Sequence, residues 1–239
     1  AEYAEQARHL LDVQQALTER HKAVAEYWAG GATGELPASY WCQFAQFVSA
    51  RDGHGDDQDA KLFFALSNAA FDAGIAAWDA KVHYDSERPI TALRYLMNGR
   101  QIRGYGPDGP RGGLRTIDGA AWMPYQAASF PTPPFADHVS GHSTFSAASS
   151  EVLRLFTGSD AFNRAVTIMA GSMLYEPGLP SDDVTLHWST FSDAAAEAGM
   201  SRIYGGIHFV HADTAGRSLG RQVGALAFDR ARQHWTGVA

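Results

Sequence analysis

The stretch PPFADHVSGHSTFSAASSEVL, residues 133–153, carries the clearest signal for the fold of this chain. It passes from a proline-rich approach through a Ser-Gly-His triplet into a run with helical spacing. A helix start needs a capping residue such as Ser140 and tolerates a glycine such as Gly141. It does not need an imidazole, so His142 indicates a role beyond capping.

Helical patterns extend outward from this stretch in both directions. The apolar residues at positions 10, 13, 17, 24 and 28 predict one long first helix that ends at the Gly30–Gly31 pair. Further helices are predicted at 61–81, 143–156, 160–174, 190–205 and 212–235. No segment alternates convincingly as a strand, and no internal repeat occurs. We therefore predict an all-α helical bundle that forms a single domain over residues 1–239.

A proline and a long loop interrupt the pattern before the triplet. Pro89 biases Arg88 away from helical angles, so the helix should break there before residues 90–97 resume it. Residues 99–134 are rich in Gly and Pro and show no sustained period. An ordered loop of that length inside a compact domain is usually functional.

Composition excludes several classes of protein. A net charge of −7 and a pI near 5.8 argue against a general nucleic-acid binder. Cys42 is the single cysteine, which excludes an intrachain disulfide and a thiolate metal cluster. No window approaches the roughly 20 apolar residues of a membrane-spanning helix, so a soluble protein is expected. The chain begins at Ala1 without a signal peptide, as a processed or trimmed chain would, and a periplasmic or secreted location is favoured over a cytoplasmic one.

Cationic residues gather in three short motifs. KVHYDSERP places Lys81 seven residues before Arg88, about two helical turns, so both can face the same side. SRIYGGIHF contributes Arg202 and His208, and the Gly205–Gly206 pair between them can bend or end the helix. Each motif alone would be an ordinary solvated or packed helix face.

Taken together, the motifs predict an oxyanion site. Guanidinium groups bind oxygen atoms bidentately, a lysine adds a point charge, and a histidine can bind or protonate an oxygen. The start of the helix after Ser140 adds a hydroxyl group and the unpaired amide of Gly141.

The set K-x6-RP, SGH and SR-x5-H resembles the superfamily of vanadium-dependent haloperoxidases, type-2 phosphatidic acid phosphatases and bacterial class A acid phosphatases. The motifs run in the family's order from Lys81 to His208. Their flanks, WDAKVHYDSERPITALR, PPFADHVSGHSTFSAAS and SRIYGGIHF, are most similar to bacterial vanadium haloperoxidase homologues.

The haloperoxidase resemblance implies vanadate as cofactor, with hydrogen peroxide, halide and an organic acceptor as substrates. It implies that His208 ligates the metal, that His142 is the acid–base, and that Lys81 also polarises the peroxide. The remaining residues that would neutralise the vanadate oxygens are Lys81, Arg88, Ser140, Gly141 and Arg202. Phosphate is expected to bind at the same site.

Two aromatic residues favour the haloperoxidase over the phosphatases. Trp78 and Phe135 are similar in placement to the halide-pocket aromatics of the fungal chloroperoxidase branch, although aromatic residues taken alone are more often core residues. The long 99–134 segment also resembles the peroxidase branch. In the phosphatases an aspartate stands four residues after the last histidine, where this chain has Ala212, with Asp213 one residue later.

Several alternatives stay open at this point. A soluble acid phosphatase would use His208 as nucleophile, through a phosphohistidine, and His142 as the acid for the leaving group. A non-catalytic phosphate-binding or sulfate-binding bundle is the third hypothesis. Asp137 and Asp85 are candidate acidic partners of His142, and His211 is assigned to the surface or to the surroundings of the site. The chain is short for a haloperoxidase, so a minimal form, a fragment and a homo-oligomer that completes its pocket through a partner subunit are all open.

Overall fold

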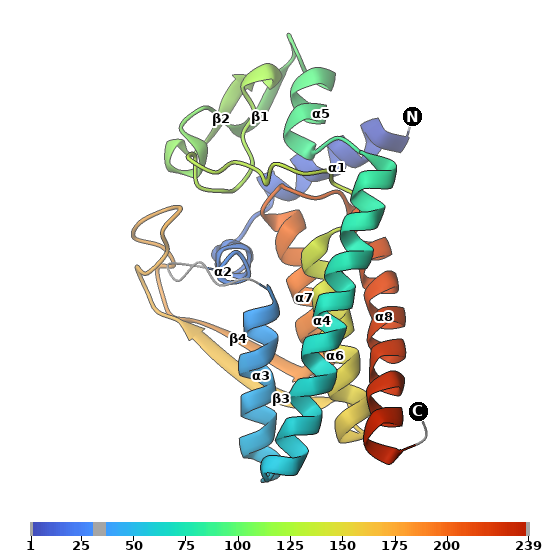
Figure 1. The fold of residues 1–239 in the computed structure, drawn as a ribbon. Helices are drawn as coiled ribbons and strands as arrows, with labels where there is room; N and C mark the ends of the chain where they lie inside the picture. The colour runs from blue at the N-terminus through green and yellow to red at the C-terminus, as the bar shows by residue number, and fades with distance from the viewer. Residues whose placement is uncertain (1, 31–36, 238–239) are drawn as a thin grey trace.

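In the computed structural model, residues 2–30 and 37–237 are described, and most of them are helical (Figure 1). Five helices run side by side along the length of the molecule and form its bundle. These are α3 (Pro37–Asp52), α4 (Asp56–Tyr84), α6 (Gly141–Thr157), α7 (Phe191–Tyr204) and α8 (Val210–Thr236). The predicted helical bundle is confirmed. That residues 1–239 form one domain stays a prediction.

Helix α4 is longer than predicted and ends where the proline predicted a break. Acidic residues in its first turn and basic residues in its last complement the helix dipole, namely Asp56, Asp57, Asp59, Lys81 and His83. Asp85 ends the helix in the left-handed region at φ 39°. Arg88 then caps α5 (Pro89–Leu96) in an extended conformation, with Pro89 at the first helical position. The break therefore places Lys81 on α4 and Arg88 at the N-cap of α5.

Helices α6 and α8 approach each other closely through glycine. Gly216, Gly220 and Gly224 on α8 face the backbone of α6. A Cβ atom at Gly216 would lie 2.8 Å from the carbonyl oxygen of Ser140, and the contacts at the other two glycines would be shorter still. This contact fixes the start of α6 against α8.

The prediction of one long first helix is wrong. The structure has two helices, α1 (Glu2–Gln15) and α2 (Glu19–Tyr27). Thr18 ends the run because its side chain accepts a hydrogen bond from the amide of His21 at 3.2 Å and so caps α2. Gly30 follows α2 at φ 98°, whereas Gly31 lies outside the described residues.

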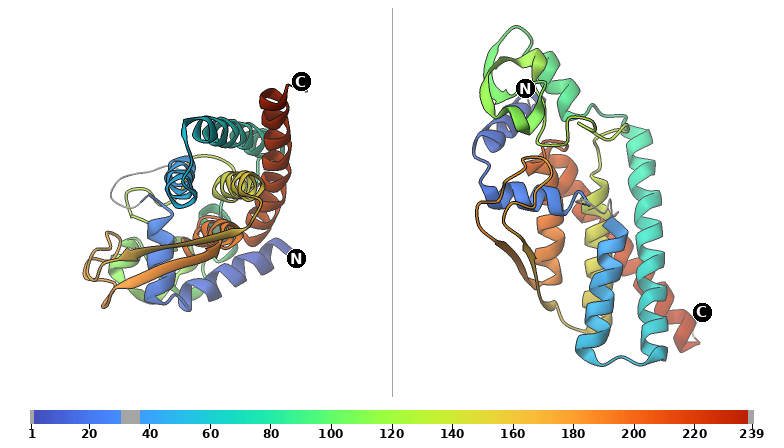
Figure 2. Two further views of the ribbon diagram at one scale, coloured as in Figure 1. Left: turned by 90° about the horizontal axis from the view of Figure 1, so that it is seen from below. Right: turned by 90° about the vertical axis from the view of Figure 1, so that its left-hand side faces the viewer.

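The prediction that no strand occurs is also wrong, because the structure contains two antiparallel hairpins. One is β1 (Gln101–Tyr105) with β2 (Leu114–Asp118), inside the segment predicted as a loop. The other is β3 (Ala161–Ile168) with β4 (Val184–Thr190), and β3 replaces the helix predicted at 160–174. Figure 2 shows this second hairpin along one side of the bundle.

The second hairpin belongs to the core. Phe162 of β3 and Trp188 of β4 are buried against α3, where Phe44 lies between them at ring distances of 5.0 and 5.5 Å. A second apolar cluster joins α1 and α5 to the β1–β2 hairpin through Leu10, Leu93 and Tyr105. Within the described residues, no helix is long and apolar enough to cross a membrane.

Candidate active site

The three predicted motifs come together around one cavity of about 470 Å³. Seven of the nine residues predicted for the site line it: Trp78, Arg88, Phe135, Gly141, His142, Arg202 and His208. The other two lie directly behind the lining. The ammonium group of Lys81 stands 5.1 Å from the centroid of the Phe135 ring, and Ser140 precedes Gly141 at the start of α6.

Backbone carbonyl groups hold Lys81 and Arg88 in place. Lys81 is 2 % exposed, and its Nζ donates to the carbonyl oxygens of Ala136 at 2.7 Å and Asp137 at 3.2 Å. Arg88 is 5 % exposed, and it donates to the carbonyl oxygens of Phe135 at 2.6 Å and Ile207 at 2.7 Å. Both cations are therefore positioned by the protein itself.

Arg202 reaches the site from the last turn of α7. It is 2 % exposed and donates to two carbonyl oxygens at the end of α2, those of Trp28 at 3.4 Å and Ala25 at 3.3 Å. The carbonyl end of a helix carries partial negative charge, which favours a guanidinium there. Arg202 thus ties α2 to the site.

Burial weakens the charged state of all three cations. It lowers the pKa of Lys81 to about 7, with a further lowering from the nearby charge of Arg88. It also lowers the pKa of Arg88 and of Arg202 to about 10 each. Positive groups that share a poorly solvated space favour an anionic ligand, because an anion offsets their mutual repulsion.

The start of α6 contributes hydrogen-bond donors. Ser140 is fully buried, and its Oγ accepts from the amide of Ser143 at 3.3 Å and lies 2.8 Å from the Oγ of Ser143. The Oγ of Ser143 donates to Asp213 at 2.7 Å. The first amides of the helix, those of Gly141 and His142, have no acceptor within the part of the chain that the structure describes. They are the kind of donors that bind anions at helix starts.

His208 is oriented by an aspartate that sequence reasoning did not assign to it. The Nδ1 atom of His208 lies 2.6 Å from Oδ1 of Asp137, and both side chains are buried. When ionised, Asp137 can only accept, so His208 carries its hydrogen on Nδ1 and has its electron pair on Nε2. That Nε2 lies 3.3 Å from Nη1 of Arg88, at the cavity.

Electrostatics agree with a neutral His208. Burial lowers its pKa well below the usual range, and the nearby charges of Arg88, Lys81 and Arg202 lower it further. Burial also raises the pKa of Asp137 to about 7, against the opposing effects of Arg88 and Lys81. An imidazole held neutral with one free nitrogen can act as a metal ligand or as a nucleophile.

His142 is anchored by α2 rather than by a carboxylate. Its Nε2 lies 2.8 Å from the carbonyl oxygen of Trp28 and 3.0 Å from Nη1 of Arg202. Burial and then the charge of Arg202 lower the pKa of His142 well below its usual range, so it is a neutral base.

The acidic residues considered from sequence take different places. Asp137 serves His208 and not His142, so that candidate assignment is wrong. Asp213 binds Ser143 and, at 2.6 Å, Arg217. It therefore braces the α6–α8 contact and makes no relay with His208. His211 is partly exposed beside Asp137, with its Nε2 3.9 Å from Oδ2 of that residue.

The residues present fit a tetrahedral or bipyramidal oxyanion. Nη2 of Arg88 and Nε of Arg202 are buried without a hydrogen-bond partner among the described residues. Such orphaned donors at a cavity are costly unless a ligand satisfies them. Within residues 2–30 and 37–237, no group of His, Cys, Asp and Glu side chains could cage a bare metal ion. The donor set is therefore suited to an anion that takes one histidine ligand.

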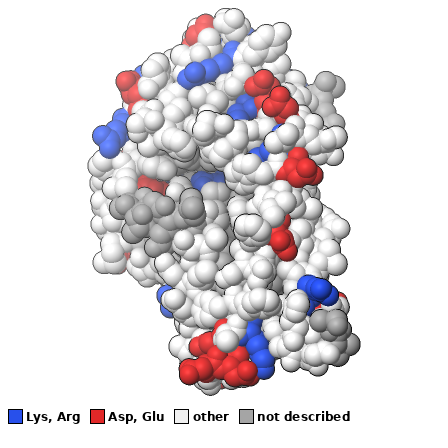
Figure 3. Space-filling view, in the orientation of Figure 1, with Lys and Arg blue, Asp and Glu red and all other residues white. Residues whose placement is uncertain are grey.

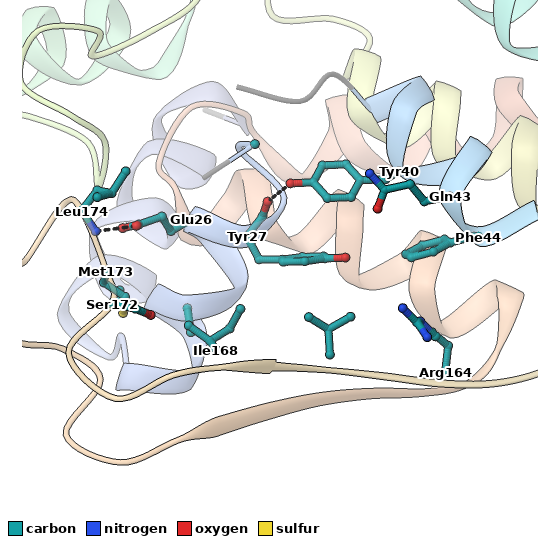
Figure 4. Close-up of a pocket in the computed structure, with 13 residues that line it drawn as sticks. Glu26, Tyr27, Tyr40, Gln43, Phe44, Arg164, Ile168, Ser172, Met173 and Leu174 are labelled. Carbon is teal, nitrogen blue, oxygen red and sulfur yellow. Dashed lines mark hydrogen bonds between the residues drawn. The ribbon is translucent and has the colours of Figure 1, made fainter. Parts of the chain in front are cut away.

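A second cavity, of about 400 Å³, lies between α2, α3 and β3 (Figure 4). Glu26, Tyr27, Phe44, Arg164 and Ile168 line it, and none of the residues predicted for the site does so. Glu26 is already bound there to the amides of Leu174 at 2.5 Å and Tyr175 at 3.0 Å. The chemistry therefore belongs to the first cavity.

Fold and site together define a helical-bundle protein with a buried cavity lined by cationic side chains. The family model described as the VCPO second helical-bundle domain matches residues 61–237, more than half of the chain. The chain therefore belongs to the vanadium-dependent haloperoxidase family.

Individual relatives agree with this assignment. The chain is 24% identical over 192 residues to the vanadium chloroperoxidase of Curvularia inaequalis, an alignment that covers 67% of this chain and 29% of that protein. It matches a holo-type bacterial vanadium-dependent chloroperoxidase with a TM-score of 0.85 and 26% identity, over 97% of this chain and 48% of that one. A bacterial vanadium-dependent iodoperoxidase matches with a TM-score of 0.70, 24% identity and coverage of 95% and 48%. The chain thus spans about half the length of these solved relatives.

Proposed function

We propose that this chain is a vanadate-dependent haloperoxidase that oxidises halide with hydrogen peroxide to hypohalous acid and thereby halogenates organic acceptors. The observation that carries the proposal is the Asp137–His208 contact at 2.6 Å, which leaves Nε2 of His208 facing a cavity lined by Arg88 and Arg202. Membership of the family supports it.

The residues that would hold vanadate follow from this geometry. His208 would be its single protein ligand through Nε2. Charge and hydrogen bonds to its oxygen atoms would come from Lys81, Arg88, Arg202, Ser140 and the amide of Gly141. When bound, vanadate supplies a Lewis acid that activates peroxide without a change in the oxidation state of the metal.

His142 would move the proton in this reaction. It is neutral, and its Nε2 lies beside the Trp28 carbonyl oxygen and Nη1 of Arg202. A bound anion would raise its pKa by offsetting the charge of Arg202. His142 can then take a proton from hydrogen peroxide and return it later, as a general acid–base requires.

An aromatic wall faces the cationic side of the cavity. The Trp78 and Phe135 rings lie 5.1 Å apart, and Phe135 lies 4.9 Å from the guanidinium carbon of Arg88. A halide ion would be attracted by the nearby positive charge and poorly solvated beside this wall, and the loss of solvation would favour its oxidation. The cavity volume leaves room for a small organic acceptor next to the anion.

Bromination of monochlorodimedone tests this function. The purified protein would be assayed with hydrogen peroxide and bromide, with and without orthovanadate, in a buffer free of phosphate. Bleaching that requires vanadate and is lost in His208→Ala is expected. No bleaching, combined with hydrolysis of para-nitrophenyl phosphate that vanadate inhibits, would instead identify a phosphatase with His208 as its nucleophile.

A further inference from the structure

Helix α4 presents an exposed apolar stripe to the outside of the bundle. Its members are Phe64, Phe71, Ile75, Trp78 and Val82, which are 46%, 69%, 56%, 41% and 80% exposed. We name these five residues the α4 seam. A large exposed apolar patch on one helix indicates a contact with another chain or segment.

The seam has the spacing of a helix-pairing surface. From Phe71 its members follow at intervals of four, three and four residues, and Phe64 precedes Phe71 by seven. This is the heptad pattern in which alternating intervals of three and four face a partner helix. Asn68 occupies the position that the pattern leaves open, so one polar residue interrupts the seam there.

The same surface offers a hollow for a partner's side chains. A cavity of about 390 Å³ opens on the seam beside Phe71, Ile75 and Trp78, and Phe145 of α6 forms its other wall. Gly74 keeps the hollow open, because a Cβ atom there would lie 3.2 Å from the Phe145 ring. Protruding side chains and a hole on one stripe are what a two-fold interface needs, since each copy must supply both.

The seam is large enough for a weak dimer. With about 150–250 Å² of surface per aromatic side chain, its exposed fractions correspond to about 500 Å² per copy and about 1,000 Å² per pair. That area stands at the lower limit of specific interfaces. In Figure 3 the surface over the middle of α4 is uncharged apart from scattered acidic side chains.

We propose that a second copy of this chain packs on the α4 seam, with the two α4 helices antiparallel across a two-fold axis near Ile75. Asp72 and Asp79 flank the seam on one side and come near each other in this arrangement. Their repulsion is screened by salt, so the dimer strengthens as ionic strength rises. The partner also covers the outer side of Trp78, which lines the active-site cavity on its inner side.

Sedimentation velocity between about 1 and 100 µM tests the pairing, since interfaces of this size commonly have micromolar dissociation constants. Wild type is expected to dimerise, and Ile75→Glu to weaken the dimer at least tenfold. Leu226→Glu on α8, at a site 72% exposed and outside the seam, is the matched control and should dimerise as wild type does. A monomeric wild type, or equal loss in both variants, would overturn the proposal and leave the seam to a different helix, such as one from the half of the relatives that this chain does not span.

Cysteine cross-linking tests the orientation in a Cys42→Ser background, because Cys42 is the single cysteine of the chain. Ile75→Cys lies near the two-fold axis and should oxidise to a covalent dimer. Val82→Cys lies at the end of the seam and should stay monomeric, because antiparallel helices place the two copies far apart. Efficient cross-linking through Val82→Cys, or none through Ile75→Cys, would exclude the antiparallel pair.

Discussion

The Oδ1 atom of Asp137 lies 2.6 Å from the Nδ1 atom of His208, across 71 positions of sequence. Asp137 stands in the segment that leads into α6, whereas His208 precedes α8. Their contact sets which nitrogen of the imidazole faces the cavity, so it determines whether His208 can act as a ligand at all. The pair is therefore the first place to test the proposed chemistry.

Replacing Asp137 by Ala should weaken vanadate binding by about 10–100-fold, the usual effect of removing the group that orients a metal-bound histidine. Vanadate affinity is best measured by the loss of bleaching activity on dilution and by calorimetry. Asp85→Asn is the control, because Asp85 ends α4 at φ 39°, a conformation that Asn also adopts. Equal effects of the two substitutions would show that Asp137 has no special role.

Replacing His142 by Ala should leave the anion bound but lower kcat by about 10²–10⁴-fold, the range for loss of a general acid–base. His142 contacts Trp28 and Arg202, and every other donor to the anion remains in place. Calorimetry with vanadate and the bromination assay would separate the two effects. A variant that loses vanadate binding as completely as His208→Ala would contradict the assignment.

Anion affinity should fall as the pH rises through about 7, because Lys81 loses its charge there. Its folded pKa of about 7 lies below the ordinary 10.5, so between these values the unfolded chain binds more protons. The free energy of unfolding of the anion-free protein should accordingly increase with pH across that window. Sulfate is a suitable probe because its charge is constant from pH 6 to 9. If one proton is linked to binding, the affinity for sulfate should fall by up to about tenfold for each unit of increase in pH.

Lys81→Met is the control for this pH dependence. The variant should bind sulfate more weakly at pH 6 and should show a flatter profile than wild type. Arg88 and Arg202 keep their charge over this range, because their pKa values stay near about 10. An identical slope in wild type and variant would mean that another group takes up the proton.

Substituting Gly220 or Gly224 by Ala should destabilise the protein by about 1–3 kcal/mol, the usual cost of overpacking. A Cβ atom at either position would collide with a carbonyl oxygen of α6, which cannot move without bending that helix. Thermal unfolding followed by circular dichroism measures the effect. Gly55→Ser is the control, because nothing lies within 4 Å of an added Cβ at that N-cap position. Unchanged melting temperatures in all three variants would show that α6 and α8 can move apart to accommodate the added methyl group at little cost in stability.

Much of the bundle could be predicted from local signals. The apolar run at 61–81 lies within α4, Pro89 marks the break after Arg88, and Ser140 caps α6 as expected. Each of these features depends on a few neighbouring residues, so the sequence expresses it directly. The meeting of the three cationic motifs at one site could also be predicted, from their spacing and from their resemblance to the family.

Other features depend on distant contacts and could not be predicted. In β3 the side chains alternate in burial, but Arg164 stands in the inward row and Ala161 and Ala165 stand in the outward row, so the apolar residues do not alternate in the sequence. The Asp137–His208 pairing joins two loops, whereas the sequence suggested Asp137 only as a candidate partner of His142. The sequence did contain one indication. Asp137 is an acidic residue just before the Ser-Gly-His triplet, and a carboxylate beside an anion-binding site is unexpected unless it binds a histidine there.

The carbonyl groups of Ala25 and Trp28 belong to α2, which precedes the region that matches the family model. Every residue of the recognisable motifs lies after position 60, yet Arg202 and His142 take their orientation from this earlier helix. The part of the chain that the family model matches is therefore smaller than the part that shapes the site. A fusion protein that contains only residues 61–237 would include all of the motifs. It would nevertheless lack the carbonyl groups of Ala25 and Trp28, to which Arg202 donates.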